Sequence, residues 1–229
     1  MRKKKVTTAE YYSTQRKFQN ALYFAKDLLR QFPVRGQGVH PLLDFVRLIG
    51  KGLQAQYLTN ILYYVDWPDL PEAYFTELGW GMRFEEVYDC LKRVDSKPHR
   101  VCKDLLLPFP GSGQKLIRDM VHIGPGRKWG DWQQNMNHHI ELWLPLGLGW
   151  VHSGEHSVTV ALLQESSQVM AEDVFHMGPL LERFYCDGEF YRLQEDDSIA
   201  GPVHCLEMAV LFELGRLMLE QGLSFETFS

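Results

Sequence analysis

The feature that most constrains the fold is a change in hydrophobic periodicity near residue 100. Before that point apolar residues recur every three or four positions, which predicts amphipathic helices over residues 9–32 and 42–65 and a shorter helix over 83–94. In 138–144 apolar and polar residues alternate instead, and this alternation predicts a half-buried strand. A chain with both patterns, in this order, is typical of an α+β protein.

We therefore expect a mainly helical N-terminal half packed on a mixed α/β C-terminal half with a small sheet. The helical region is expected over residues 1–100, and the α+β region with the site over 101–229. No Ser/Gly-rich or highly charged linker divides them, so one compact unit is expected. The pair Asp187-Gly188 predicts a type I′ hairpin turn, and Gly222 predicts the end of a C-terminal helix.

The composition is that of an ordinary folded protein, with 45% hydrophobic and 23% charged residues. No apolar run approaches the roughly 18 residues that a membrane span needs, and no apolar segment follows the basic start MRKKK. The four cysteines stand far apart without a CxxC pair, which favours reduced thiols over a disulfide framework or a zinc knuckle. We expect a cytoplasmic protein that does not enter the membrane.

The charges are distributed unevenly along the chain. Residues 1–35 carry nine Lys/Arg and two acids, whereas residues 151–229 carry three Arg and fourteen acids. The basic start is suited to phosphates of a nucleic acid, or is a solvated tail. The acidic C-terminal third favours a basic protein partner.

The stretch GLGWVHSGEHSVTVALLQ, residues 147–164, holds the candidate site. After Ser153-Gly154 the pattern fits either a second strand, which would close a hairpin, or a helix. In a helix the first amides after Gly154 have no partner within the helix, and with the helix dipole they favour an anion. Glycine also lets the backbone approach a ligand closely.

The block HHIELWLP…GWVHSGEHSVTVALL…QVMAEDV resembles the central unit of the ParB/sulfiredoxin-like superfamily, in which a strand, a Gly-containing His/Arg turn and a helix hold nucleotide phosphates. This resemblance favours the helix over the hairpin, and it implies that Gly154, His156 and Ser157 occupy the phosphate-facing turn. Ser157 stands where an arginine is common in that superfamily, so a bidentate guanidinium clamp is missing there.

The whole chain also resembles an uncharacterised family of bacterial and phage proteins. The resemblance is carried by HPLLDF, VHIGPGRKWGDWQQNMNHHIELWLPLGLGWVHSGEHS and YCDGEFYR. It implies no known activity.

A second group of chemically active residues lies in HIGPGRKWGDWQQNMNHH, residues 122–139. Arg127 and Lys128 offer positive charge for a phosphate, and Trp129 and Trp132 offer faces on which a base stacks. The alternative for the tryptophans is structural, because aromatic residues so close together also pin a long loop to the core.

Five of the nine histidines fall between residues 122 and 156, which raises a metal hypothesis. His139 shares a strand face with Glu141, and His139, His152 and His156 are the candidate ligands of zinc, manganese or iron. No HExxH or similarly tight spacing is present, and the alternative is a set of histidines hydrogen bonded around a cleft.

The leading functional expectation is a phosphate- or nucleotide-binding protein that acts in phosphoryl transfer or phosphodiester hydrolysis on a nucleotide, with Mg²⁺, or on a nucleic acid. The expected catalytic residues are His156 as phosphate donor or acid–base group, Glu155 as ligand of a metal or water, and Arg127 as the neutralising charge. The expected ligand-binding residues are Gly154, Ser157, Lys128, Trp129, Trp132 and His139. Two alternatives stay open: a non-catalytic interaction module or inhibitor linked to phage defence, and a His-rich metal-dependent hydrolase.

Overall fold

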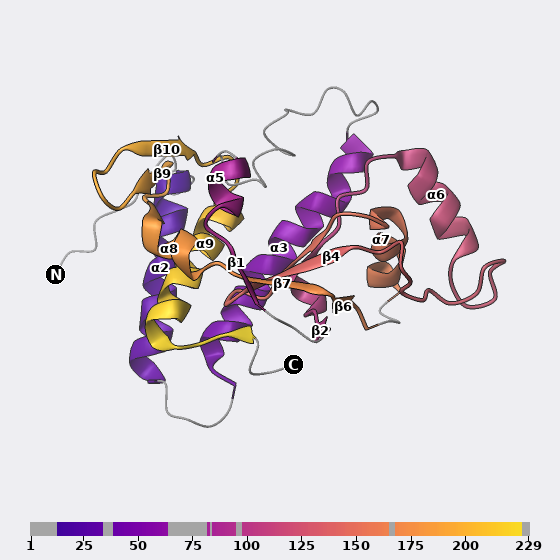
Figure 1. Cartoon of the computed structure of the whole chain (residues 1–229), viewed down its shortest axis with the longest axis horizontal. Coiled ribbons are helices and arrows are strands. Elements are labelled where there is room, and N and C mark those ends of the chain that lie inside the picture. Colours follow the sequence, from indigo (N-terminus) through magenta and orange to yellow (C-terminus); the bar gives the residue numbers. More distant parts are fainter. Residues whose placement is uncertain are drawn as a thin grey trace, which may run out of the picture.

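The computed structural model describes residues 13–33, 39–63, 82, 84–94, 98–164 and 168–225. It is an α+β protein built around one five-stranded sheet with helices on both faces (Figure 1). The strand order is β1 (Lys92–Val94), β7 (Asp173–His176), β4 (Ile140–Leu144), β5 (Leu148–Val151) and β3 (Leu106–Leu107). The pairs β7–β4 and β5–β3 are parallel, and β1–β7 and β4–β5 are antiparallel.

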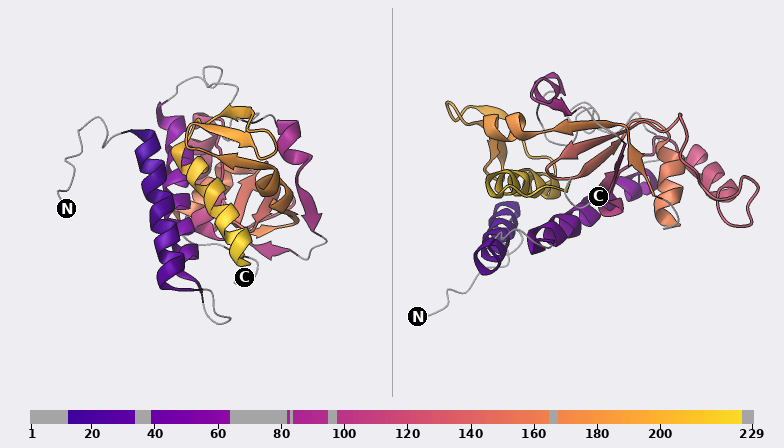
Figure 2. Two further views of the ribbon diagram at one scale, coloured as in Figure 1. Left: turned by 90° about the vertical axis from the view of Figure 1, so that its left-hand side faces the viewer. Right: turned by 60° about the horizontal axis from the view of Figure 1, so that its bottom comes forward.

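Among the described residues, one group of helices lies on the side of the sheet that faces the N-terminal helices, and a second group lies toward the other side (Figures 1 and 2). The first group is α2 (Thr14–Gln31), α3 (Pro41–Tyr63), α8 (Gly178–Arg183) and α9 (Leu206–Gln221), with the short α5 (Phe84–Tyr88) nearby. The second group is α6 (Gly113–His122) and α7 (Glu155–Leu163). The helices α6 and α7 lie together at the end of the molecule farthest from α2.

Two smaller sheets complete the fold. The strands β8 (Phe184–Cys186), β9 (Phe190–Leu193) and β10 (Ile199–Pro202) form an antiparallel sheet. The strand β2 (His99–Arg100) pairs with β6 (Met170–Ala171), and β2 leads into a 3₁₀ turn, η2 (Lys103–Leu105). None of the helices in the described part of the chain is long and apolar enough to cross a membrane.

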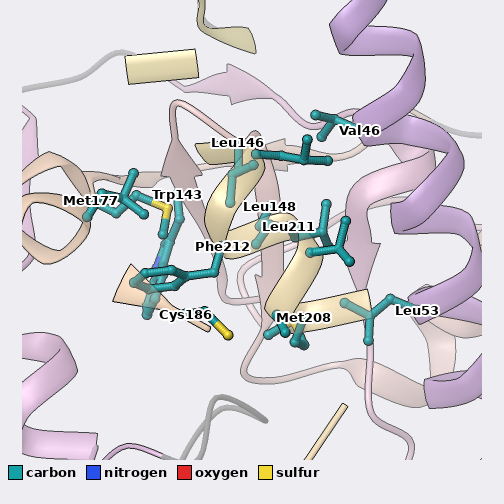
Figure 3. Packing of buried hydrophobic residues seen from close by; sticks show 14 of the residues in the cluster. Val46, Leu53, Trp143, Leu146, Leu148, Met177, Cys186, Met208, Leu211 and Phe212 are labelled. Carbon is teal, nitrogen blue, oxygen red and sulfur yellow. The ribbon is translucent and has the colours of Figure 1, made fainter. Parts of the chain in front are cut away.

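The larger of two hydrophobic cores joins the helical N-terminal region to the C-terminal region. Trp143 and Leu148 of the central sheet meet Phe212 of α9, while Val46 and Leu53 approach from α3 (Figure 3). The smaller core lies between the opposite face of the sheet and α7. Because β4 alternates, Ile140, Leu142 and Leu144 enter the smaller core while Trp143 enters the larger one.

The strand predicted over 138–144 exists, but it is not half buried. All five residues of β4 are buried, because β4 lies at the centre of the sheet with helices on each face. The buried polar member is Glu141, which is 7% exposed. Its burial requires hydrogen-bonding partners.

Two further local predictions need correction. The helix predicted over 83–94 ends at Tyr88, and Lys92–Val94 form the edge strand β1 instead. The hairpin at Asp187-Gly188 exists, but it is not a type I′ turn, which needs a positive φ at both central residues. Only Gly188 has one (97°), while Asp187 accepts the backbone N–H groups of Glu189 and Phe190. The helices at 9–32 and 42–65 are confirmed over their described parts, and Gly222 ends α9 with φ 65°.

Candidate functional site

The turn after β5 is the start of the candidate site, and it opens a helix. Gly154 has φ 76° and is the N-cap of α7, so the helical interpretation is confirmed and the hairpin interpretation is wrong. The first bond of the helix runs from Val158 N to Gly154 O. The amides of Glu155, His156 and Ser157 therefore have no carbonyl partner within α7.

His138 lies directly against this turn. Asn135 N donates to His138 Nδ1 at 3.0 Å, so His138 carries its proton on Nε2 and donates it to Ser157 Oγ at 2.8 Å. Ser157 Oγ in turn donates to Gly154 O at 3.0 Å. Burial lowers the pKa of His138, and this favours the neutral ring that the hydrogen bonds require.

A pocket of about 450 Å³ lies beside the first turn of α7. Ser157 and His138 form its helix side, and the loop that precedes β4 forms the rest. The other lining residues are Ile123, Trp129, Gly130, Asp131, Trp132, Gln133 and Asn135. The structure thus brings Ser157, Trp129 and Trp132, three of the expected ligand-binding residues, to one pocket.

The two tryptophans differ in their surroundings. Trp132 is 6% exposed, belongs to the smaller core and meets the edge of the His138 ring at 5.1 Å. Trp129 is 49% exposed, stacks on His122 at 4.6 Å and lies 5.7 Å from the guanidinium of Arg118. Trp132 therefore pins the loop, as the structural alternative predicted, whereas Trp129 leaves about half of its surface open to a ligand.

His156 points away from this pocket, toward the start of α6. Its Nε2 accepts from Ser112 N at 3.0 Å, and its Nδ1 lies 3.2 Å from Glu155 Oε1. Burial lowers the pKa of His156, so the ring is neutral with its proton on Nδ1. Both ring nitrogens are occupied, and His156 holds α6 against α7. It would have to leave Glu155 to donate to a phosphate.

Arg127 and Lys128, the two cations expected to neutralise a phosphate, do not reach the turn at Gly154. Arg127 Nη1 donates to Met120 O and Ile123 O, each at 2.6 Å, and so caps the C-terminal end of α6. Gln164, which follows α7, donates to the same Ile123 carbonyl at 2.8 Å. Arg127 thus lies near the C-terminal end of α7, whereas Glu155 is its first residue, and a helix of nine residues is about 13 Å long. Lys128 is exposed and does not line the pocket.

A second polar cluster lies on the opposite face of the sheet, around Glu141. Its Oε2 accepts from Tyr88 Oη at 2.8 Å and Trp143 Nε1 at 3.1 Å, and it lies 3.2 Å from His152 Nε2. The phenol pKa of Tyr88 is raised, first by burial and then by its bond to this carboxylate. Glu141 is therefore a buried anion with three donors.

His139 extends this cluster to the surface. Its Nε2 lies 3.0 Å from Asp173 Oδ2, and Asp173 also pairs with Arg93. The rings of His139 and His152 are 5.3 Å apart. His138 and His139 thus point to opposite faces, as the strand pattern predicts.

The three histidines of the metal hypothesis do not converge. His139 and His152 belong to the Glu141 cluster, but His156 is held between Ser112 and Glu155 on the other face. Within the described ranges no group of three or more His, Cys, Asp or Glu side chains is arranged to hold a metal ion. The ligand set His139, His152 and His156 is therefore wrong as a single site.

Comparison with known proteins adds the family. Residues 3–225 match the model of a family of unknown function, DUF6710. The chain belongs to this family. No curated protein and no solved structure gives a significant match. The expectation of a family of unknown function is therefore confirmed.

Sequence reasoning missed three residues of the DUF6710 protein's polar clusters. Arg93 and Asp173 come from β1 and β7 and reach the Glu141–His139 region through sheet pairing, whereas Tyr88 comes from α5 and reaches Glu141 by its hydroxyl. In the parallel register Glu141 stands beside Asp173, which puts both carboxylates on one face. No local motif carries this signal; only the strand order would have revealed it.

Gly154→Ala tests the geometry of the turn in the DUF6710 protein. A Cβ at Gly154 would lie 2.4 Å from His138 Cδ2, in addition to the strain of φ 76°. We expect a loss of about 2 kcal/mol in the free energy of unfolding, measured by urea denaturation. Gly222→Ala is the matched control, because its φ is 65° and nothing lies within 4 Å of its Cβ. Equal losses in the two variants would contradict the packing of His138 on the turn.

Proposed function

We propose that the protein binds a phosphorylated ligand, a nucleotide or the end of a nucleic acid, in the pocket beside α7. The observation that carries the proposal is that the first turn of α7, whose amides have no partner within the helix, adjoins a pocket of about 450 Å³ that is also lined by the half-exposed Trp129. Pockets of this size with a few directed polar groups are typical of small-molecule sites.

The phosphate is assigned to the first turn of α7. The amides of His156 and Ser157 are donors there, and the positive end of the helix dipole favours an anion. The His138 Nε2–H and the Ser157 hydroxyl, which are bonded to Ser157 Oγ and Gly154 O, would turn from these partners toward the phosphate. The resemblance of this strand, turn and helix to the ParB/sulfiredoxin-like superfamily supports the same assignment. Arg127 donates to carbonyl groups of α6, so the donors at the turn carry no positive charge. Because the charge of the phosphate is then not balanced by the protein, we propose that the phosphate binds together with Mg²⁺.

The base is assigned to Trp129. His122 stacks on its indole and the Arg118 guanidinium lies over the ring, while the side chain as a whole is about half exposed and lines the pocket. Stacking of a base on an aromatic side chain contributes about 1–3 kcal/mol. Asp131, Gln133 and Asn135 on the pocket wall offer hydrogen bonds to base or ribose edges.

A catalytic role in phosphoryl transfer or phosphodiester hydrolysis belongs to the same proposal. Glu155 is the residue best suited to hold Mg²⁺ or a water, because its side chain is 28% exposed at the first position of α7. His156 would act only after its bond to Glu155 opens. Hydrolysis of a nucleotide that needs Mg²⁺ and is lost in Glu155→Gln would support this role.

Binding is tested by titrating the protein with ADP, with and without Mg²⁺, and following tryptophan fluorescence and heat. We expect Ser157→Ala to raise the Kd by at least about 10-fold, the effect of one lost hydrogen bond to a charged group. Trp129→Ala is expected to raise it about 10-fold.

The controls for this titration are Ser198→Ala and Tyr23→Ala. Both residues are exposed and lie outside the pocket, on the β9–β10 turn and on α2. Their Kd values should equal that of the unmodified protein. The proposal fails if ADP does not bind, or if the pocket variants and the controls bind it equally.

A second candidate function is a non-catalytic interaction with a basic protein. The turn between β9 and β10 exposes three consecutive acids, Glu195, Asp196 and Asp197, at the end of the molecule away from α7 (Figure 1). Other acids of this third are already paired, as Asp187 is with Arg192 and Glu213 with Arg216. A salt-sensitive complex lost on Glu195→Gln but kept in Ser157→Ala would favour this function.

A further inference from the structure

A second pocket, of about 470 Å³, lies between the start of α3, the segment from β2 through η2, and the β4–β5 turn. It shares no residue with the pocket beside α7. Its lining residues are Val39, Leu43, Asp44, Arg47, His99, Arg100, Val101, Cys102, Lys103, Asp104, Leu142, Gly147 and Phe225.

The charges around this pocket are arranged by Asp104. Its carboxylate accepts from Arg47 Nε at 2.8 Å and Nη2 at 2.7 Å, and it lies 3.4 Å from Lys51 Nζ. One carboxylate is thus shared by two cations. The hydrogen bond to Asp104 raises the pKa of Arg47, so its guanidinium stays charged and fixed in orientation.

Two more cations line the same pocket. Arg100 and Lys103 stand on either side of Val101 and Cys102 in the β2–η2 segment. Arg100 is exposed, and no acid of the described residues forms an ion pair with it. Asp44 is the remaining acid of the lining and lies 3.5 Å from Arg47. Positive charge therefore exceeds negative charge here, in a chain whose net charge is −5.

The rest of the lining is apolar. Leu43, Val101 and Leu142 are buried and belong to the two cores, whereas Val39 is 57% exposed at the rim. Phe225 is half buried and packs over Gly147, where an added Cβ would lie 2.7 Å from its side chain. A ligand in this pocket meets a hydrophobic floor below a cationic rim.

We propose that this pocket binds a small amphipathic anion, an apolar or aromatic body that carries one carboxylate, sulfonate or phosphate group. The body replaces water over Leu43, Val101 and Leu142, and the anionic group pairs with Arg100 at the rim. Arg–anion pairs are among the stronger directed interactions, and a pocket of this volume encloses a ligand of about that size. The site is independent of the function proposed for the α7 pocket.

The test uses two fluorescent probes of similar shape. The anionic probe is 8-anilinonaphthalene-1-sulfonate, and the uncharged probe is N-phenyl-1-naphthylamine. We expect the anion to bind at least 10-fold more tightly, and Arg100→Gln to raise its Kd about 5–10-fold, with a larger rise in the double variant Arg100→Gln, Lys103→Gln. Raising the salt concentration should weaken binding of the anion and leave binding of the uncharged probe nearly unchanged.

Three further variants locate the site. Arg100→Lys keeps the charge and should restore most of the affinity, and Val39→Glu places a carboxylate at the rim and should abolish binding. Lys92→Gln removes an exposed cation of the edge strand β1 and should have no effect. The proposal is overturned if the two probes bind equally, or if Arg100→Gln and Lys92→Gln have the same affinity for the anion.

Discussion

Replacing Glu141 with alanine is expected to lower the free energy of unfolding by about 3 kcal/mol. The carboxylate is 7% exposed and accepts the Tyr88 hydroxyl and the Trp143 indole N–H while pairing with His152. Its removal takes one acceptor from each of these donors and opens a small cavity at the centre of the sheet. Urea denaturation measures the loss.

Two control variants distinguish the loss of this hydrogen-bond network from the effect of removing any carboxylate. Glu182→Ala removes an exposed carboxylate of α8 and should change stability by no more than about 0.5 kcal/mol. Glu141→Gln keeps the shape but not the charge, and its loss should be smaller than that of alanine. An alanine variant as stable as Glu182→Ala would contradict the buried network.

Acid should weaken the same network. Burial by itself would raise the pKa of Glu141, but the bonds from His152, Tyr88 and Trp143 outweigh it and hold the pKa below the usual value of 4.5. The resulting stability is present above the unfolded-state pKa and is lost as pH falls through the folded-state pKa. The unmodified protein should therefore lose more stability than Glu141→Gln below about pH 4.5.

Replacing Phe212 with alanine is expected to cost about 3–5 kcal/mol, the second large effect. Phe212 is fully buried on α9, meets the ring of Tyr191 at 5.3 Å and packs in the core that holds α2, α3 and the central sheet. Alternate residues of β4 belong to the two cores. A substitution that destabilises the larger core should therefore also destabilise the smaller one. Hydrogen exchange should then show α2 and α7 losing protection together.

Phe24→Ala is the control for this prediction, because Phe24 is 52% exposed on α2. It should cost under about 1 kcal/mol. If α2 lost protection in Phe212→Ala while α7 kept it, the two cores would unfold independently, contrary to the expectation of one compact unit.

The sequence predicts helices better than strands in this fold. The helices α2, α3 and α9 follow an apolar period that local sequence shows directly. The strand β1 could not be predicted from the local sequence, because Lys92–Val94 continues the apolar pattern of the preceding helix. These residues form a strand by pairing with β7. The full burial of β4 likewise depends on its neighbours, which no local pattern reveals.

The candidate site could be predicted in part. The helix after Gly154 was expected from the superfamily resemblance, because the local pattern fits a strand equally well, and Ser157 and Trp129 were named as candidates and line one pocket. The positions of His156 and Arg127 were not predicted, since each is fixed by a distant backbone group, Ser112 N and the last carbonyls of α6. Such contacts depend on helix packing.

The most direct test of the proposed function is an NMR titration with ADP and Mg²⁺ that follows backbone amides. The largest shifts should fall on Glu155, His156 and Ser157, with the Trp129 indole N–H moving at the same ligand concentration. Ser157→Ala should weaken all of these shifts together. Amide resonances of Glu155 to Ser157 that stay unchanged at saturating ADP would contradict the central claim.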